Sequence, residues 1–276
     1  YGHDGQHRLF NGIVIRFIAG AMYDREYRTY HAEIAPWLWL LTRTGGCRIF
    51  KSKKTSDIVK EVIQSAGSYD IINKVSTETT HEYCVQYNET SFNFISRIME
   101  HDGIFYYFEH SNGKHSMVIA SAVIVHTRCR ESEIEYEPAA HTMNVITEWL
   151  PGHQFRTGKH SDRDYDFETA ATIEAKTTTL INVSDFKKWE TYEFGGNFFQ
   201  KAAADTLSRT RIEEEEATYA ETQGRSTCTS FAAGSKFLLK SHDIDQEAGG
   251  EYLLTWVHHS AQDGSHAIGG ATASYG

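Results

Sequence analysis

The sequence is poor in proline and has no excess of positive charge. Its 276 residues include 3 prolines, and 27 lysines and arginines stand against 37 acidic residues, for a net charge of −10. Nucleic-acid binding needs clustered basic side chains, so this balance argues against a nucleic-acid partner. The longest apolar run, Trp37–Leu41, is too short to span a bilayer. We therefore expect no stable insertion of this chain into a membrane.

Cysteine is also scarce, and the cysteines are widely spaced. The four cysteines are Cys47, Cys84, Cys129 and Cys228. None of them forms a C-x-x-C pair, and three of the four lie in strand-like runs. This pattern predicts buried free thiols and synthesis in a reducing compartment, not a disulfide framework. The first residues, Tyr1-Gly-His-Asp, include neither an initiator methionine nor a secretion signal. We interpret the chain as a fragment of a longer protein.

Motifs for catalysis, cofactors and metals are missing as well. There is no H-E-x-x-H, no G-x-S-x-G and no glycine-rich phosphate loop. His110 and His115 flank a hairpin turn and could meet across it, but two ligands make a weak zinc site. Glu100 and Asp102 are one pair among many acidic residues, so they do not by themselves indicate a pair of catalytic carboxylates. Burial in a strand would raise the pKa of Cys84, which argues against a reactive thiolate. We predict no catalytic residues, no cofactor or cofactor-binding residues, and no metal ligands.

The most regular part of the sequence is centred on Glu82–His110. It opens with the alternation of a strand, and Thr90 or Ser91 can then cap a helix. Gly103 is placed to end that helix in a left-handed conformation, and Asn112-Gly113 suits a tight hairpin turn. The turn joins strand Ile104–Glu109 to its partner His115–Ala120. This segment predicts a compact α+β unit whose helix buries Phe94, Ile95, Ile98 and Met99.

Two more helices and a series of strands are expected outside this segment. One helix begins at Thr55 or Ser56 and ends at Gly67, and another covers Phe198–Ile212 with Ala202, Ala203 and Leu207 buried. We expect loops at Pro151–Lys159 and Asp162–Glu168. The expected buried aromatic and aliphatic residues are Trp37, Trp39, Phe94, Ile98, Phe105 and Tyr107. The expected strands are Leu9–Ile18, Tyr27–Ala35, Trp37–Leu41, Ala122–His126, Glu133–Tyr136, Met143–Trp149, Thr177–Val183, Ser226–Phe231, Lys236–Ser241 and Glu251–His259.

Several of these segments resemble one known family. EYCVQYNE, SFNFISRIMEHDGIFYYFEH and HSMVIA closely resemble the signature of the VgrG proteins, the spike-tip components of the bacterial type VI secretion system. Agreement continues upstream in FNGIVIRF, PWLWLLTRTGGCRIF and SDIVKEVI. Downstream it continues in DYDFE, GSKFLLKSH and YLLTWVHHSA. The match runs in order along almost the whole chain, so it is far more specific than a single motif.

The resemblance implies a fold and a domain order. The fold would be mainly β with α+β insertions, built on two related β-barrel domains as in phage baseplate hub proteins. Residues 1–50 would form the first barrel, truncated at its N-terminus, and residues 51–120 an α+β insertion domain. Residues 121–263 would form the second barrel with a helical excursion. Residues 264–276 would be a flexible tail leading to a missing needle region.

The resemblance also implies a structural, non-enzymatic function. Three chains would form a homotrimer that adapts a hexameric secreted tube to a three-fold needle, which punctures target envelopes and carries effectors. The implied partners are an Hcp-like tube protein and effector or spike-cap proteins. Assembly would take place in the bacterial cytoplasm, and the type VI apparatus would then translocate the spike without a signal peptide.

Two alternatives remain open from the sequence. The chain could be a β-rich module that binds a ligand or a surface, in which case it would be a monomer. It could also be an effector enzyme such as a glycan hydrolase. That alternative requires a deep cleft with two convergent carboxylates.

Overall fold

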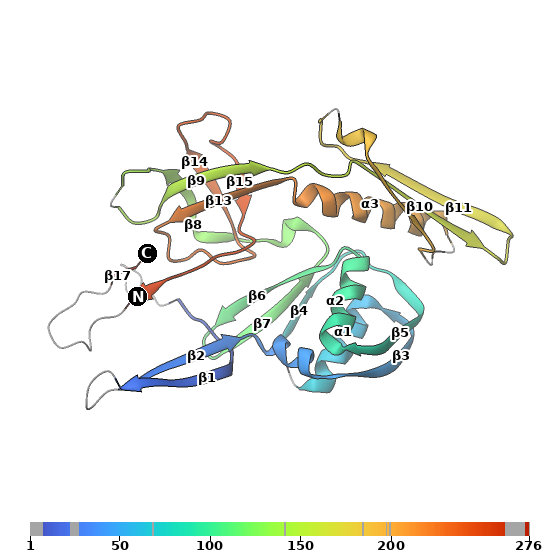
Figure 1. Cartoon of the computed structure of the whole chain (residues 1–276), viewed down its shortest axis with the longest axis horizontal. Helices are drawn as coiled ribbons and strands as arrows, with labels where there is room; N and C mark the ends of the chain where they lie inside the picture. Colours follow the sequence, from blue (N-terminus) through green and yellow to red (C-terminus); the bar gives the residue numbers. More distant parts are fainter. Residues whose placement is uncertain are drawn as a thin grey trace. The chain divides into compact units, whose positions relative to one another are not determined.

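The computed structural model describes residues 8–22, 28–67, 69–140, 142–183, 185–196, 198, 200–262 and 274–275 (Figure 1). Strands far outnumber helices in the described residues, which confirms the mainly β fold class. The chain forms two compact units. Unit 1 comprises residues 1–132, 229–238 and 251–259, and unit 2 comprises residues 133–228, 239–250 and 260–276. The chain passes from one unit to the other within β8 (Arg128–Tyr136) and β14 (Lys236–Ser241).

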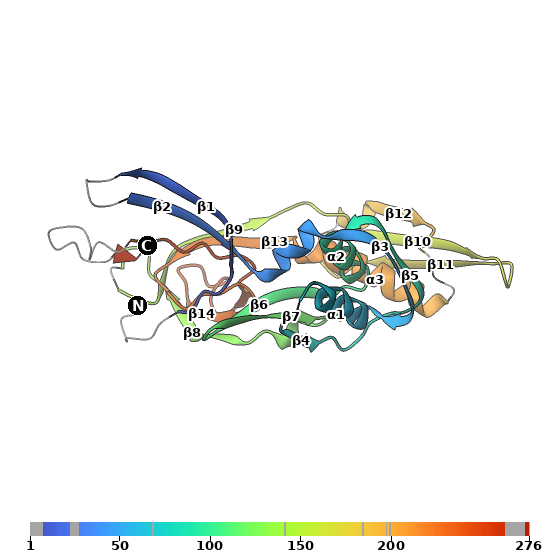
Figure 2. The same cartoon turned by 90° about the horizontal axis from the view of Figure 1, so that it is seen from below.

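An α+β layer forms the most deeply packed part of unit 1. Strand β3 (Gly45–Lys54) pairs antiparallel with β5 (Thr80–Thr90). In a second sheet, β7 (Lys114–Ala120) lies between β4 (Ile71–Lys74) and β6 (Phe105–Ser111). Helices α1 (Thr55–Ala66) and α2 (Ser91–His101) lie between the two sheets (Figures 1 and 2). Their amphipathic faces meet in one hydrophobic cluster.

The ends of α2 are fixed by the residues that the sequence indicates. The hydroxyl oxygen of Thr90 accepts a hydrogen bond from the backbone N–H of Asn93 at 3.1 Å, which satisfies one of the free donors of the first turn. At the other end Gly103 has a φ of 66°, in the left-handed region that glycine tolerates best. The predicted strand, helix and hairpin around Glu82–His110 are thus confirmed, as is the helix that ends at Gly67.

The burial predictions are confirmed for half of the six residues. Trp37, Phe94 and Ile98 are buried, whereas Trp39, Phe105 and Tyr107 are only partly buried. The predicted strand at Trp37–Leu41 is wrong, since Trp37–Arg43 forms the 3₁₀ helix η1. Pro36 starts it and accepts a hydrogen bond from the N–H of Trp39 at 3.0 Å. A helical turn can bury Trp37, Leu38 and Leu41 together, so an apolar run does not require two buried strand faces.

The remaining elements of unit 1 differ more from the sequence-based expectations. β1 (Ile13–Met22) and β2 (Arg28–Ala35) form a hairpin, so the first strand lies four residues later than predicted. The predicted strand Ala122–His126 is wrong, because Val123–Val125 forms the 3₁₀ turn η2. Strand β14 was predicted with its observed bounds. Its partner β15 covers only Glu251–Leu253 of the predicted Glu251–His259, because only three residue pairs of the ladder form.

Unit 2 contains part of a five-stranded sheet, a three-stranded sheet and a short two-stranded pair near its C-terminal end. Strand β9 (Val145–His153) pairs antiparallel with β13 (Ala220–Ser226) and parallel with the end of β8. In the three-stranded sheet, β10 (Lys159–Asp166) lies between β11 (Ala171–Thr178) and β12 (Glu190–Phe194). Helix α3 (Lys201–Ala217) packs against β10 and β11 (Figure 1). The short elements η3 (Phe186–Lys188), β16 (Ala261–Gln262) and β17 (Ser274–Tyr275) complete the unit.

Several predictions for unit 2 are wrong, chiefly because long-range pairing overrides local composition. Pro151 lies inside β9, and the acidic segment predicted as the loop Asp162–Glu168 forms most of β10. The buried residues of α3 are Ala204, Leu207, Ser208 and Ile212, whereas Ala202 and Ala203 are exposed. The predicted strands Thr177–Val183 and Ser226–Phe231 overlap the observed ones only at their ends. The predicted flexible tail Gly264–Gly276 lies outside the described residues, apart from Ser274 and Tyr275.

No helix in the described part of the chain is long and apolar enough to cross a membrane.

Candidate functional site

One face of the β1–β2 hairpin is an unusually apolar exposed surface. The register of the two strands places Val14 opposite Ile34, and the rings of Phe17 and Tyr30 stack with centroids 5.4 Å apart. These four side chains are 58%, 64%, 63% and 56% exposed, in the order named. A two-stranded hairpin with one hydrophobic face is marginal in water without something packed against that face. The face is therefore a candidate contact surface.

The opposite face of the hairpin is more polar, although Ile18 also lies on it. A bulge between Val14 and Arg16 shifts the alternation, so that Arg16 and Glu33 share the other side and form an ion pair at 2.9 Å. His31 lies further along that side, opposite Ile18. The sequence pattern thus assigns one side of the hairpin to water and leaves the other apolar side for a partner.

The two histidines of the β6–β7 turn meet as the sequence suggests. His110 and His115 are opposite each other in the register, with ring centroids 5.7 Å apart. His110 Nδ1 accepts a hydrogen bond from the N–H of Asn11 at 3.1 Å, and His115 Nε2 accepts one from the N–H of Trp37 at 3.0 Å. Burial lowers the pKa of both rings, which favours the neutral form that accepts these bonds. Both side chains therefore serve as structural acceptors.

Asp102 joins the start of α1 to the end of α2. Its carboxylate accepts hydrogen bonds from the hydroxyl of Thr55 at 2.5 Å and from the N–H of Thr79 at 2.9 Å. His81 Nε2 lies 2.8 Å from the same hydroxyl. Because the single hydroxyl proton of Thr55 goes to Asp102, His81 cannot also act as a base toward it. Thr55 is fully buried, so this arrangement resembles a nucleophile site in residue type only.

The cysteine environments agree with the prediction of free thiols. The described cysteines are all free, with Cys84, Cys129 and Cys228 buried and Cys47 exposed. Burial raises the pKa of Cys84, as expected, and raises that of Cys129 to about 11. Thiols with raised pKa values are poor nucleophiles at pH 7, so their role is packing.

One shallow pocket in unit 1 has a volume of about 320 Å³ and contains a single carboxylate. That carboxylate, Glu251, forms ion pairs with Lys236 and Arg128, and hydrogen bonding from Lys236 lowers its pKa. An ionised, paired carboxylate without a second acid beside it does not provide the two carboxyl groups of a glycan hydrolase. The pocket is lined by Val123, Ile124, His126, Lys236, Glu251, Tyr252 and Leu253.

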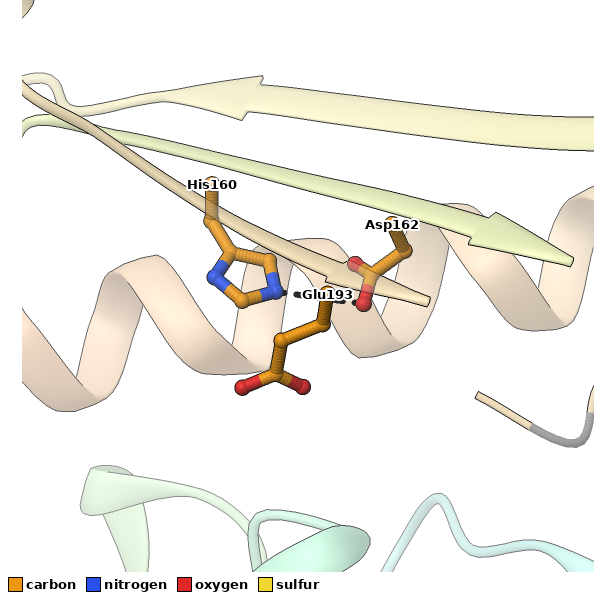
Figure 3. Close-up of side chains that lie close together, drawn as sticks. All are labelled: His160, Asp162 and Glu193. Carbon is orange, nitrogen blue, oxygen red and sulfur yellow. Dashed lines mark hydrogen bonds and ion pairs between the residues drawn. The ribbon is translucent and has the colours of Figure 1, made fainter. Parts of the chain in front are cut away.

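A cluster in unit 2 was not anticipated from the sequence. His160 and Asp162 on β10 and Glu193 on β12 lie close together, and the imidazole of His160 faces the carboxylate of Asp162 (Figure 3). His160 Nε2 lies 3.1 Å from Asp162 Oδ1, and both residues are buried. The H-x-D spacing would have placed the first two on one face of a strand, had this segment been predicted as one. The position of Glu193 depends on pairing between distant strands and carries no local signal.

Comparison with known proteins identifies relatives along almost the whole chain. The family model of the phage tail baseplate hub (GPD) matches residues 2–265. The type VI secretion system spike protein VgrG1b of Pseudomonas aeruginosa is 30% identical over 97% of this chain and 37% of its own length. The actin cross-linking toxin VgrG1 of Vibrio cholerae is 22% identical over 91% of this chain and 23% of its own length. The chain thus spans between about a quarter and little more than a third of the length of these relatives.

A solved structure supports the same fold. The Escherichia coli c3393 protein, described as a type VI secretion component with structural similarity to the T4 bacteriophage tail proteins gp27 and gp5, aligns with a TM-score of 0.61. The alignment covers 89% of this chain and 55% of that protein at 15% sequence identity. At this identity the likeness establishes the fold.

Proposed function

The chain belongs to the phage tail baseplate hub (GPD) family, and from that membership we propose that it is the hub portion of a type VI secretion spike. Support comes from the similarity to the spike protein VgrG1b over 97% of the chain. The proposal is structural: the chain provides contact surfaces that hold a spike at the end of a tube.

We propose the domain order expected for such a hub. Residues 1–50 belong to a first barrel, residues 51–120 to an α+β insertion, and residues 121–263 to a second barrel with a helical excursion. The well-packed cluster of α1, α2 and the adjacent strands supports the α+β insertion, although Trp37, Leu38, Leu41 and Phe50 from the preceding segment also contribute to that core. Helix α3 on the β10–β12 sheet supports the helical excursion.

Three copies of the chain are proposed to form a ring that adapts a hexameric, Hcp-like tube to a three-fold needle. Contacts in a cyclic trimer are heterologous, so each copy presents two different surfaces. The apolar face of the β1–β2 hairpin is our candidate for one of them, because Val14, Phe17, Tyr30 and Ile34 are all more than half exposed. This exposed face is the observation on the molecule itself that carries the assembly proposal.

The remaining parts of the proposal concern partners and location. A spike hub would be assembled in the cytoplasm, carry effector or spike-cap proteins, and be exported by the type VI apparatus. We propose no enzymatic activity for this chain. The toxin relative matches over only 23% of its own length, which leaves most of that protein outside the shared region.

The trimer is tested by the mass of the protein in solution. Multi-angle light scattering over a range of concentrations should give three times the 31.3 kDa of one chain. Replacing Phe17 with glutamate puts a charge in the middle of the apolar face, and we expect the trimer to dissociate to monomers. A charge buried without a partner opposes association strongly enough to abolish a contact of this kind.

The matched control is Ile18→Glu, which places the same charge on the same strand but on the polar side of the hairpin. It should leave the trimer intact. Circular dichroism of both variants checks that the fold is retained. A protein that remains a monomer at all concentrations would contradict the hub assembly, and a Phe17→Glu variant that still forms trimers would remove this face from the interface.

A further inference from the structure

His160, Asp162 and Glu193 are brought to one side of a sheet by strand geometry alone. Side chains alternate along a strand, so His160 and Asp162, two residues apart on β10, share a face. β12 runs parallel to β10, and its register sets Glu193 beside Asp162. The three side chains lie close together on two adjacent strands, as Figure 3 shows.

Two members of the cluster are held rigidly. His160 is 4% exposed and Asp162 is 2% exposed. The backbone carbonyl of His160 accepts a hydrogen bond from Ser208 Oγ on α3 at 3.1 Å, which fixes β10 against the helix. Glu193 is exposed, so its side chain can adjust, and one ligand atom from each of the three residues lies within 4.8 Å of the others.

The hydrogen bond between His160 and Asp162 leaves one polar atom of the cluster without a partner. Asp162 Oδ2 is buried and has no hydrogen-bond partner among the described residues. A buried polar oxygen left without a hydrogen-bond partner is costly. Across the described ion pairs, neither Asp162 nor Glu193 contacts a lysine or an arginine, although Glu190 and Glu174 of the same sheet both do. No lysine or arginine of the described ion pairs thus contacts either carboxylate of the cluster.

We propose that His160, Asp162 and Glu193 bind a divalent transition-metal ion, with zinc as the ion that fits best. Imidazole nitrogen and carboxylate oxygen are both zinc ligands, at about 2.0–2.2 Å. Two such ligands at a tetrahedral angle lie roughly 3.3–3.6 Å apart, slightly more than the separation in this cluster. The separation of His160 Nε2 and Asp162 Oδ1 is 3.1 Å. The ion would neutralise the carboxylates, and water would supply a fourth ligand.

The consequence for the fold is a cross-link between β10 and β12. All five residues of β12 are exposed, and the strand is held at the edge of its sheet by pairing with β10. A metal bound to Glu193 on one strand and to His160 and Asp162 on the other would tie this edge strand in place. Such a role needs no reaction at the metal.

Metal titration of the whole chain tests the proposal. Zinc is titrated into chelator-treated protein in competition with a chromogenic chelator, and cobalt is added separately to record its visible absorption bands. We expect one tightly bound zinc per chain and a rise in the midpoint of thermal unfolding. Glu193→Gln removes an exposed ligand with almost no change in shape and should weaken zinc binding at least tenfold. Asp162→Asn should abolish the cobalt bands.

The matched control is Glu174→Gln on β11, which removes a carboxylate from the opposite face of the same sheet. It should bind zinc as the unchanged protein does, and so separates this site from weak binding at surface histidines. Circular dichroism identifies any variant that fails to fold. If Asp162→Asn fails to fold, Glu193→Gln still tests the proposal. The proposal is overturned if the unchanged protein takes up no stoichiometric zinc, or if Glu193→Gln binds as tightly as Glu174→Gln.

Discussion

Replacing Phe94 with alanine should lower the free energy of unfolding by about 3–5 kcal/mol, the range found for truncating large buried aromatic residues. Phe94 is fully buried, and its ring stacks on Phe50 with the centroids 5.6 Å apart. It belongs to the cluster that joins α1, α2, β3 and β7. Truncation removes the contacts of the ring and leaves a cavity that the surrounding helices and strands can close only in part.

Urea denaturation followed by circular dichroism measures this effect. Phe94→Leu, which keeps most of the volume, should cost clearly less than Phe94→Ala. Asn93→Ala on the exposed side of the same helix should change stability by about 0.5 kcal/mol or less. If Phe94→Ala costs under about 1 kcal/mol, α2 does not pack as described, and the cluster is not the core of this unit.

Replacing Asp102 with asparagine should cost about 2 kcal/mol at pH 7. The side chain of Asp102 is 2% exposed. Burial by itself raises the pKa of Asp102, but hydrogen bonds from His101, Thr55 and Thr79 outweigh it and lower the pKa from 3.8 to about 2. A difference of almost two pKa units between the folded and unfolded states corresponds to about 2 kcal/mol. Asparagine retains the shape but loses the charge that strengthens these bonds.

The same shift fixes the direction of the pH dependence. The folded-state pKa lies below the unfolded value, so the stabilisation is fully present above about pH 4 and is lost as the pH falls toward 2. The test is to measure the unfolding free energy of the unchanged protein and of Asp102→Asn at pH 7, 4, 3 and 2. The two values should differ at pH 7 and become equal toward pH 2.

Asp70→Asn is the control for this series. Asp70 also pairs with a cation, Lys114, at 2.7 Å, but its side chain is 52% exposed. Exposed pairs contribute about 0–1 kcal/mol, so its loss should be small. A constant difference between the unchanged protein and Asp102→Asn from pH 7 to pH 2 would mean that the charge of Asp102 is not what stabilises the junction of α1 and α2.

The sequence predicted the α+β layer well because its signals are local. Thr90 and Gly103 define the two ends of α2, and each acts on backbone only a few residues away in the sequence. Asn112-Gly113 defines the hairpin turn in the same local way. The apolar spacing of Phe94 and Ile98 then places the buried face. Each of these choices depends on chemistry within one or two helical turns, which a single sequence contains.

The prediction failed where distant pairing decides the structure. Strand β10 is rich in acidic residues, which local sequence composition assigns to a loop. It is nevertheless a strand because it is hydrogen-bonded on both sides, by β11 and β12. Its buried polar residues His160 and Asp162 satisfy each other in part, which makes a polar strand tolerable in the interior. No local rule brings Glu193, more than thirty residues away, to the same place, so the cluster of His160, Asp162 and Glu193 was inaccessible from the sequence.

The path of the chain through its two units has a consequence for synthesis on the ribosome. Unit 1 needs residues 229–238 and 251–259, which follow the 96 residues 133–228 of unit 2. At about 5–20 residues per second, the early part of unit 1 waits roughly 5–20 s for its last segments. During that interval Thr127 lacks the N–H of Lys236, and Arg128 lacks its partner Glu251. A nascent chain must therefore keep unit 1 open at this end while most of unit 2 is still being made.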